Sequence, residues 1–282
     1  MVGGDGELEQ KVVRHAEVIA KNLSLEDPPS TYTSRILLTV MDLLRNPDPY
    51  KQLKAEQNRV VRPIAEKAER EIDEGPEALK AALMLAAAGN VIDQGPRHSF
   101  SIDDALSRLR FVHDDSAMLM ARLGRASRVM YILDNSGEVM FDMIVLKRLP
   151  ASDLTIVARS SPILNDVTVS EAKDLGLERF GSVIGTGSSF LGVDLATVSD
   201  EFRQAYEQAE VVIAKGHANF ESLFEKGRDC FMVLKAKCEL VAEPLGVGLG
   251  ESACFYSKGQ SRTTPEAKQP GTQVRSQTAP GS

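Results

Sequence analysis

Two adjacent oxygen-bearing side chains, Asp134 and Asn135, directly follow an apolar run at 129–133. Such a pair can hold a hard cation, and the helix start that comes next, Ser136 to Glu138, directs backbone N–H groups toward an anion. A metal ion beside an anion indicates a phosphate ligand. The same dipeptide also forms ordinary Asx turns and helix caps, so a purely structural interpretation stays open at this point.

Further polar residues follow the next apolar runs of the chain. Asp166, with Asn165 before it, either caps a helix expected at 167–175 or adds a second carboxylate to the cation site. An Asp, Asn and Asp set contains only oxygen ligands, which suits magnesium, manganese or cobalt better than a closed zinc site. Lys215 and Arg159 end two other runs, where their charges would offset phosphate oxygens or simply be solvated at the surface.

The N-terminal third contributes another candidate pair. Asn90 and Asp93 follow the most apolar helical stretch, at 78–88, where they would either cap the helix end or provide polar contacts to the cleft. The chain lacks the glycine-rich dinucleotide loop, the phosphate-binding loop of nucleoside triphosphatases and the serine-hydrolase elbow. Those three classes of chemistry therefore have no motif in their favour.

The apolar pattern that must position these side chains changes near residue 123. Before it, three- and four-residue spacings predict helices only. After it, short β-branched runs alternate with helical stretches, which predicts a parallel or mostly parallel sheet with right-handed crossovers. The expected strands are at 129–133, 154–158, 183–184, 211–214 and 231–234. We therefore expect a helical domain at 1–123 and an α/β domain at 124–256.

Composition narrows the possible partners. The 282 residues include 33 Lys and Arg against 40 Asp and Glu, a net charge of −7. A segment at 257–282 carries +3 and lacks apolar periodicity, so we expect a disordered tail. The acidic remainder argues against nucleic acid, and the absence of a run of about 20 apolar residues argues against a membrane span. The expectation is a cytoplasmic protein whose three cysteines are reduced thiols; its oligomeric state is not readable.

Five blocks, in order, resemble signature blocks of the damage-control phosphatase family, long labelled domain of unknown function 89. They are Gly89-Asn90-Val-Ile-Asp93, Ile132-Leu-Asp134-Asn135-Ser-Gly137-Glu138, Pro162-Ile-Leu-Asn165-Asp166, Ala214-Lys215-Gly216 with Asn219-Phe-Glu221, and Leu234-Lys235-Ala-Lys237-Cys238. The first block resembles the stand-alone prokaryotic branch, and the whole resemblance covers residues 7–256. Members of that branch often open with a Cys-x-x-Cys segment, which this chain lacks, and often have glycine where Ser160 follows Arg159.

The resemblance implies a helical N-terminal domain packed on a three-layer α/β/α sandwich. It also implies a divalent-metal phosphatase that acts on small phosphorylated metabolites, either sugar phosphates or damaged phosphopantetheine derivatives. In the family, the Asp and Asn of the second block and the Asp of the third bind the metal, which carries over to Asp134, Asn135 and Asp166. The Lys of the fourth block faces the substrate phosphate, which carries over to Lys215.

Our hypothesis is a phosphomonoesterase that uses magnesium, manganese, cobalt or nickel. Its expected catalytic residues are Asp134, Glu138 and Lys215. Its expected substrate- and phosphate-binding residues are Ser136, Gly137, Arg159, Lys215, Asn219, Asn90 and Asp93. The alternative is a non-catalytic protein that binds metal and a phosphorylated metabolite without turnover. A methyltransferase is disfavoured because no glycine-rich cofactor loop follows the first strand.

Overall fold

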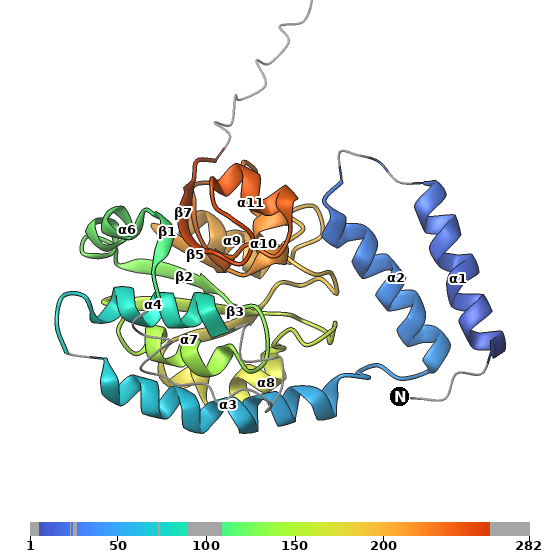
Figure 1. The fold of residues 1–282 in the computed structure, drawn as a ribbon, viewed down its shortest axis with the longest axis horizontal. Coiled ribbons are helices and arrows are strands. Elements are labelled where there is room, and N and C mark those ends of the chain that lie inside the picture. The colour runs from blue at the N-terminus through green and yellow to red at the C-terminus, as the bar shows by residue number, and fades with distance from the viewer. Residues whose placement is uncertain (1–5, 23, 25–26, 73, 90–108, 260–282) are drawn as a thin grey trace, which may run out of the picture.

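The structure is a computed structural model that describes residues 6–22, 24, 27–72, 74–89 and 109–259 (Figure 1). Asn90, Asp93 and most of the expected tail lie outside the described residues. The elements, in chain order, are α1 (Gly6–Lys21), α2 (Pro29–Leu44), α3 (Lys51–Glu71), α4 (Ala78–Ala88), β1 (Phe111–Asp114), α6 (Ser116–Leu123), β2 (Arg128–Ile132), α7 (Val139–Leu146), β3 (Asp153–Ala158), α8 (Val169–Asp174), the 3₁₀ helix η2 (Leu177–Arg179), β4 (Ser182–Gly185), α9 (Asp200–Gln208), β5 (Val211–Lys215), α10 (His217–Leu223), β6 (Cys230–Lys235), α11 (Glu239–Leu245) and β7 (Ser252–Ser257).

The described strands form one sheet in the order β1-β7-β6-β5-β2-β3-β4. Strands β6, β5, β2, β3 and β4 run parallel to one another, whereas β7 is antiparallel to β6 and parallel to β1. Helices cover both faces (Figure 1). This confirms the prediction of a mostly parallel α/β/α sandwich with helices in its N-terminal region.

The centre of the sheet explains why the apolar runs are continuous. Strands β5 and β6 are buried along almost their whole length, as is β2 after its first residue, because helices pack on both faces. Strand β2 lies between β3, the next strand in the chain, and β5, which the chain reaches only after β4. The strand order therefore reverses between β2 and β5, and such a switch point is where open α/β sheets bind ligands.

Two apolar layers hold the helices to the sheet. On one face, side chains of α3, α4, α6, α7 and α8 pack together with alternate residues of the central strands, among them Tyr131 and Ile213. On the other face, α9, α10 and α11 pack against residues such as Met130 and Val212. Helix α4 is buried, as its apolar sequence predicts. The N-terminal helices α3 and α4 thus share a core with the sheet.

Three local features differ from the sequence-based expectations. Strand β1 lies within 1–123, where only helices were expected, and β7 was not expected at all. Both strands belong to the antiparallel end of the sheet, where apolar runs are short. The division into domains stays a prediction. The third difference is the N-terminal cap of α8. It is Thr168, which forms a reciprocal capping box with Glu171, so neither Asn165 nor Asp166 caps this helix.

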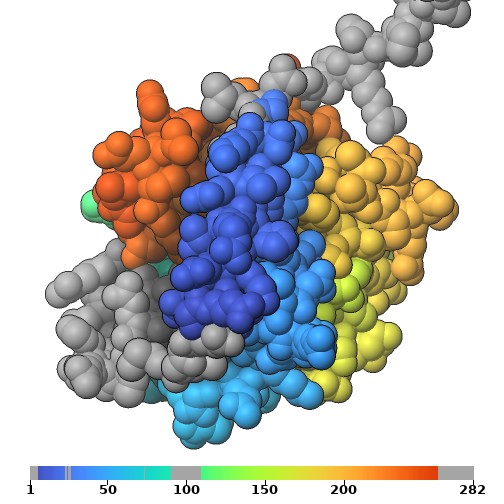
Figure 2. All heavy atoms as spheres, turned by 90° about the vertical axis from the view of Figure 1, so that its right-hand side faces the viewer, coloured from blue at the N-terminus to red at the C-terminus, as the bar shows by residue number. Residues whose placement is uncertain are grey.

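Helices α1 and α2 form a hairpin in front of the carboxyl ends of the strands (Figure 1). Figure 2 shows α1 lying across the middle of this face of the molecule. Two hydrogen bonds attach α2 to the body: the Ser30 amide donates to Glu221 Oε2 (3.0 Å), and the Leu191 amide donates to Ser34 Oγ (2.8 Å). Among the residues described, no helix is both long and apolar enough to cross a lipid bilayer.

Candidate metal and phosphate site

The loops after β2 and β3 are joined by backbone hydrogen bonds, which brings the predicted metal ligands together. The Ser136 amide donates to the Asn165 carbonyl (2.8 Å), and the Val167 amide donates to the Asp134 carbonyl (2.9 Å). An isolated bridge also pairs Asn135 with Asp166. The tertiary structure therefore places Asp134, Asn135 and Asp166 side by side at the switch point.

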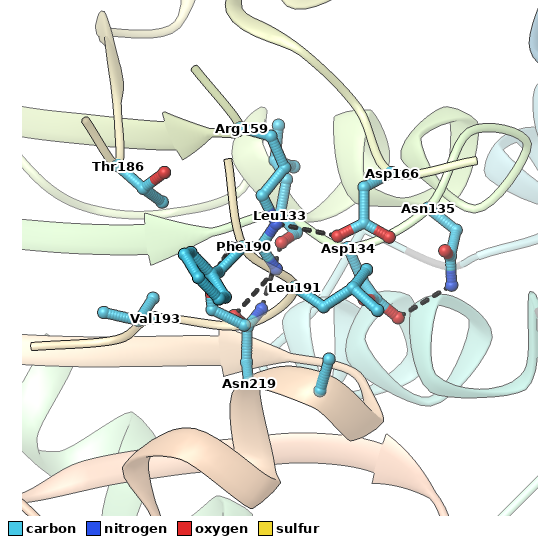
Figure 3. A network of polar contacts seen from close by, with 12 residues as sticks. Leu133, Asp134, Asn135, Arg159, Asp166, Thr186, Phe190, Leu191, Val193 and Asn219 are labelled. Atoms are coloured by element: carbon cyan, nitrogen blue, oxygen red, sulfur yellow. Dashed lines mark hydrogen bonds and ion pairs between the residues drawn. The ribbon is translucent and has the colours of Figure 1, made fainter. Parts of the chain in front are cut away.

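The carboxylates of this group are held in fixed orientations. Asn135 Nδ2 donates to Asp134 Oδ2 (2.8 Å) and to Glu138 Oε1 (3.1 Å), as Figure 3 shows for the first of these bonds. Asp134, Glu138 and Asp166 are each no more than 4% exposed. The amide oxygen of Asn135 is not used in these bonds, so it remains available as a ligand.

Arg159 lies between Asp166 and Asn219 and is almost fully buried (Figure 3). Its Nε donates to Asp166 Oδ2 (2.7 Å), and its terminal nitrogens donate to the Gly192 carbonyl and to Asn219 Oδ1 (3.0 Å). Asn219 Nδ2 donates in turn to the carbonyl oxygens of Leu133 and Lys215. Arg159 and Asn219 were predicted to contact substrate, and in this arrangement they orient Asp166 and connect β2, β3 and β5.

Lys215 is also buried, and its ammonium group is surrounded by acceptors. Its Nζ lies 2.9 Å from the Ala86 carbonyl oxygen, 3.0 Å from Asp142 Oδ1 and 3.6 Å from Glu138 Oε2. The hydroxyl of Tyr131 donates to the same oxygen of Asp142 (2.8 Å). Three acceptors match the three donors of an ammonium group. Lys215 therefore holds Glu138 in place, and its predicted contact with phosphate stays a prediction.

Burial shifts the pKa values of the site carboxylates upward. Desolvation raises the pKa of Asp134 well above its ordinary value, and the neighbouring charges of Glu138 and Asp166 add to the effect. Desolvation also raises the pKa of Asp166, against the opposing charge of Arg159. Glu138 behaves in the same way, with the charge of Lys215 opposing the upward shift of its pKa. The metal-free site is therefore short of positive charge.

A divalent cation fits this imbalance. Four buried carboxylates, those of Asp134, Glu138, Asp142 and Asp166, face two buried cations, Arg159 and Lys215, which leaves a formal charge of −2. Buried charge that is not compensated is strongly unfavourable, so a doubly charged ion would restore the balance. In the described ranges, no three or more His, Cys, Asp or Glu side chains form a metal centre. The predicted set differs in kind, because it has two carboxylates and one amide, and hard cations accept amide oxygens as ligands.

The helix start after Asn135 is less open to an anion than the sequence suggests. The amide of Gly137 donates to Asn58 Oδ1 on α3 (2.6 Å), and the amide of Ser136 is already bound to the Asn165 carbonyl. The buried hydroxyl of Ser136, by contrast, has no hydrogen-bond partner among the described residues. Ser136 can therefore contact a ligand through its side chain, while Gly137 makes contact with α3.

Sequence reasoning missed Lys237 as a site residue. It follows β6 and is exposed, and no described residue forms a hydrogen bond or an ion pair with its ammonium group. Its charge nevertheless lowers the pKa values of Asp134, Glu138 and Asp166, so it lies near the same group of carboxylates. The pattern Lys235-Ala-Lys237 was the available signal, because it follows a buried strand as Lys215 does.

A cavity of about 580 Å³ lies elsewhere, at the amino ends of the strands, where it is lined by Tyr206 and Arg228 among others. It contains none of the carboxylates described above. The chemistry of the side chains, rather than the size of a cavity, therefore identifies the candidate site.

Gly216 allows β5 to approach the first metal ligand closely. Its φ is +82°, and a Cβ atom at this position would lie 1.9 Å from Asp134 Oδ2. We predict that Gly216→Ala displaces Asp134, abolishes divalent-metal binding and destabilises the fold by about 2 kcal/mol or more. Calorimetric metal titration and thermal unfolding measure the two effects.

The matched control is Gly246→Ala. Gly246 has a similar φ of +65°, but a Cβ atom there meets no atom within 4 Å. This variant should lose about 1 kcal/mol through backbone strain and keep its metal affinity. Equal metal affinity in both variants would contradict the proposed role of Gly216.

The chain is similar to known proteins over most of its length. Residues 3–253 match the sequence model described as "Damage-control phosphatase ARMT1-like domain". The chain is 35% identical to a damage-control phosphatase of Pyrococcus horikoshii over 251 residues, 86% of each chain. It is 28% identical to a damage-control phosphatase of Archaeoglobus fulgidus, over 86% of this chain and 88% of that protein.

A solved structure shows the same fold. The crystal structure of a DUF89 family protein from Pyrococcus horikoshii aligns with a TM-score of 0.81 and 34% identity, covering 90% of this chain and 91% of that one. The named relatives are phosphatases, and the similarity extends over nearly the whole chain. The chain belongs to the damage-control phosphatase family.

Proposed function

We propose that the protein is a divalent-metal-dependent phosphatase of small phosphorylated metabolites, either sugar phosphates or damaged phosphopantetheine-type phosphomonoesters. The observation that carries the metal dependence is the buried charge of −2 at the switch point of the sheet. Asp134, Asn135 and Asp166 would hold the ion, which is magnesium, manganese, cobalt or nickel. A phosphatase named among the relatives supports the reaction class.

When bound, a divalent ion supplies a Lewis acid for a phosphoryl oxygen and lowers the pKa of a coordinated water. The protein contributes the surrounding groups. Glu138, whose pKa is raised by burial, is suited to position the attacking water and accept its proton. The Ser136 hydroxyl and the Lys237 ammonium can contact phosphate oxygens, because neither is engaged elsewhere among the described residues. Lys215 and Arg159 keep the carboxylates in position.

The first test is phosphate release from a panel of phosphomonoesters, p-nitrophenyl phosphate included, by chelator-stripped protein. We expect no release without metal, and release that returns with one or more of magnesium, manganese, cobalt and nickel. Asp134→Asn should stay inactive with every ion, because it removes one of two carboxylate ligands. Failure of folded wild-type protein to release phosphate while it binds a metal would favour the binding-only alternative.

A second prediction concerns the stability of the metal-free protein. The ordinary pKa of Asp134 is 3.8 and its folded-state pKa is raised, so above about pH 4 the folded state binds more protons than the unfolded state. The carboxylate therefore costs stability as pH rises from about 4 through the raised pKa. Metal-free Asp134→Asn should unfold at a higher temperature than wild type at pH 8, and the difference should be much smaller at pH 4.

Added metal provides the control for this stability comparison. Saturating divalent ion should stabilise the wild type at pH 8 and leave Asp134→Asn unchanged. Identical pH profiles for the two metal-free proteins would show that Asp134 carries no excess buried charge.

A third prediction tests Lys237 as the cation that meets phosphate. Lys237→Gln should lower kcat/KM by about tenfold or more, because it removes the free charge that faces the carboxylates. Steady-state kinetics with the best substrate of the panel would measure it. Lys226→Gln is the matched control. Lys226 is also an exposed lysine, but it precedes β6 and so lies near the amino end of that strand, whereas Lys237 follows its carboxyl end. Equal losses in the two variants would refute a specific role for Lys237.

A further inference from the structure

A thiol, an imidazole and a carboxylate converge beside the candidate site. Cys238 Sγ lies 3.4 Å from His217 Nε2, and the same nitrogen lies 3.4 Å from Glu221 Oε1. All three side chains are half-buried, and none has a role in the proposed phosphatase reaction. His217 follows Gly216, which abuts Asp134, and Cys238 follows Lys237. The cluster therefore lies at the edge of the metal site.

The geometry excludes two familiar explanations for such a cluster. In a nucleophilic triad the histidine faces the nucleophile with one ring nitrogen and the acid with the other. Here both Cys238 and Glu221 face Nε2, and Nδ1 of His217 is buried without a hydrogen-bond partner in the described part of the chain. A metal centre is also unsupported, because no three such side chains among the described residues have suitable geometry.

What the cluster does provide is a thiol with a proton acceptor next to it. Burial lowers the pKa of His217, and the charge of Lys237 lowers it further, which favours the neutral imidazole. Its Nε2 lies 3.4 Å from Cys238 Sγ, close enough to accept the thiol proton. A half-buried cysteine whose thiol lies beside a histidine is in a setting where thiols can be reactive.

The two other cysteines have the opposite environment. Cys230 and Cys254 are buried in the sheet, and desolvation raises the pKa of both thiols, that of Cys254 to about 12. Neither thiol is expected to ionise or to be reached by a reagent in the folded protein. The chain thus contains one half-buried thiol beside a histidine and two buried reference thiols.

We propose that Cys238 is a site of reversible modification by small disulfides, activated by His217. The thiol proton moves to His217 Nε2, and the thiolate attacks one sulfur of the disulfide. A new S–S bond forms to Cys238 as the original S–S bond breaks. The released thiolate takes the proton from His217, so one thiol is produced for each mixed disulfide formed.

Modification at this position has a consequence that rests on the proposed function. The adduct would lie next to Lys237, which faces the carboxylates, and next to Glu221, whose Oε2 accepts the hydrogen bond from Ser30 at the start of α2. A group attached to Cys238 would therefore lie beside the candidate metal site. It would also lie beside the hydrogen bond between Ser30 and Glu221, which attaches α2 to the body. Substrate access should fall when the thiol is modified and recover when it is reduced.

The experiment treats the full chain at pH 7 with 5,5′-dithiobis(2-nitrobenzoate), a small aromatic disulfide, and follows thiol release by absorbance and the modified residue by mass spectrometry. Cys238 should react at least about tenfold faster than Cys230 and Cys254 in the folded protein. All three should react at similar rates after unfolding. Modification of Cys254 as fast as Cys238 in the folded protein would overturn the proposal without any variant.

His217→Asn tests the activation itself. It should slow modification of Cys238 by about tenfold or more, while thermal unfolding and the protection of Cys230 remain unchanged. An unchanged rate in a folded His217→Asn protein would overturn the role of the imidazole.

The activity of the same samples separates this inference from the phosphatase proposal. Phosphatase activity should fall with modification of the wild type, return with dithiothreitol, and be unaffected by the reagent in Cys238→Ser. Selective modification of Cys238 in a protein without phosphatase activity would leave the thiol site intact and refute only the proposed function. Full activity after complete modification would overturn the effect on substrate access.

Discussion

The rest of the site depends on one electrostatic constraint, which is the burial of four carboxylates beside only two cations. Removing one partner from such a group leaves an uncompensated charge in the interior, which costs several kcal/mol. Each buried cation therefore forms ion pairs with the carboxylates. Arg159 pairs with Asp166, and Lys215 pairs with Glu138 and Asp142. The negative charge that remains is the basis on which we propose a divalent ion at this site.

This constraint explains why distant parts of the chain converge on the switch point. The loops after β2 and β3 are joined backbone to backbone, and Gly216 gives β5 room beside Asp134. The N-terminal helices provide partners as well, since Asn58 on α3 binds the Gly137 amide and the carbonyl of Ala86 on α4 binds Lys215. These helices complete the hydrogen bonding of the site in addition to covering the sheet.

The basic residues near the site show what a local sequence pattern leaves open. Lys215 and Arg159 end apolar runs, and the sequence favoured both as phosphate contacts. The structure surrounds both with acceptors, and their contact with phosphate stays a prediction. Lys237 is exposed, and its charge acts on the same carboxylates. A lysine after a buried strand has the same local pattern in both cases. Only the arrangement of its neighbours decides whether its charge is already neutralised.

The sequence by itself determined the central strands, the helical N-terminal region and the position of Asp134, Asn135 and Asp166 at strand ends. These follow from short-range patterns, because continuous apolar runs specify buried strands and the residue after a strand lies at its carboxyl edge. The capping of α8 by Thr168 is equally local, because its partner Glu171 is only three residues away. The tertiary structure alone decided that β1 and β7 extend the sheet, and which of the described cations near the site is left without a partner. Those features depend on contacts between residues far apart in the chain. A local sequence pattern does not show which partners will surround a side chain or how deeply it will be buried.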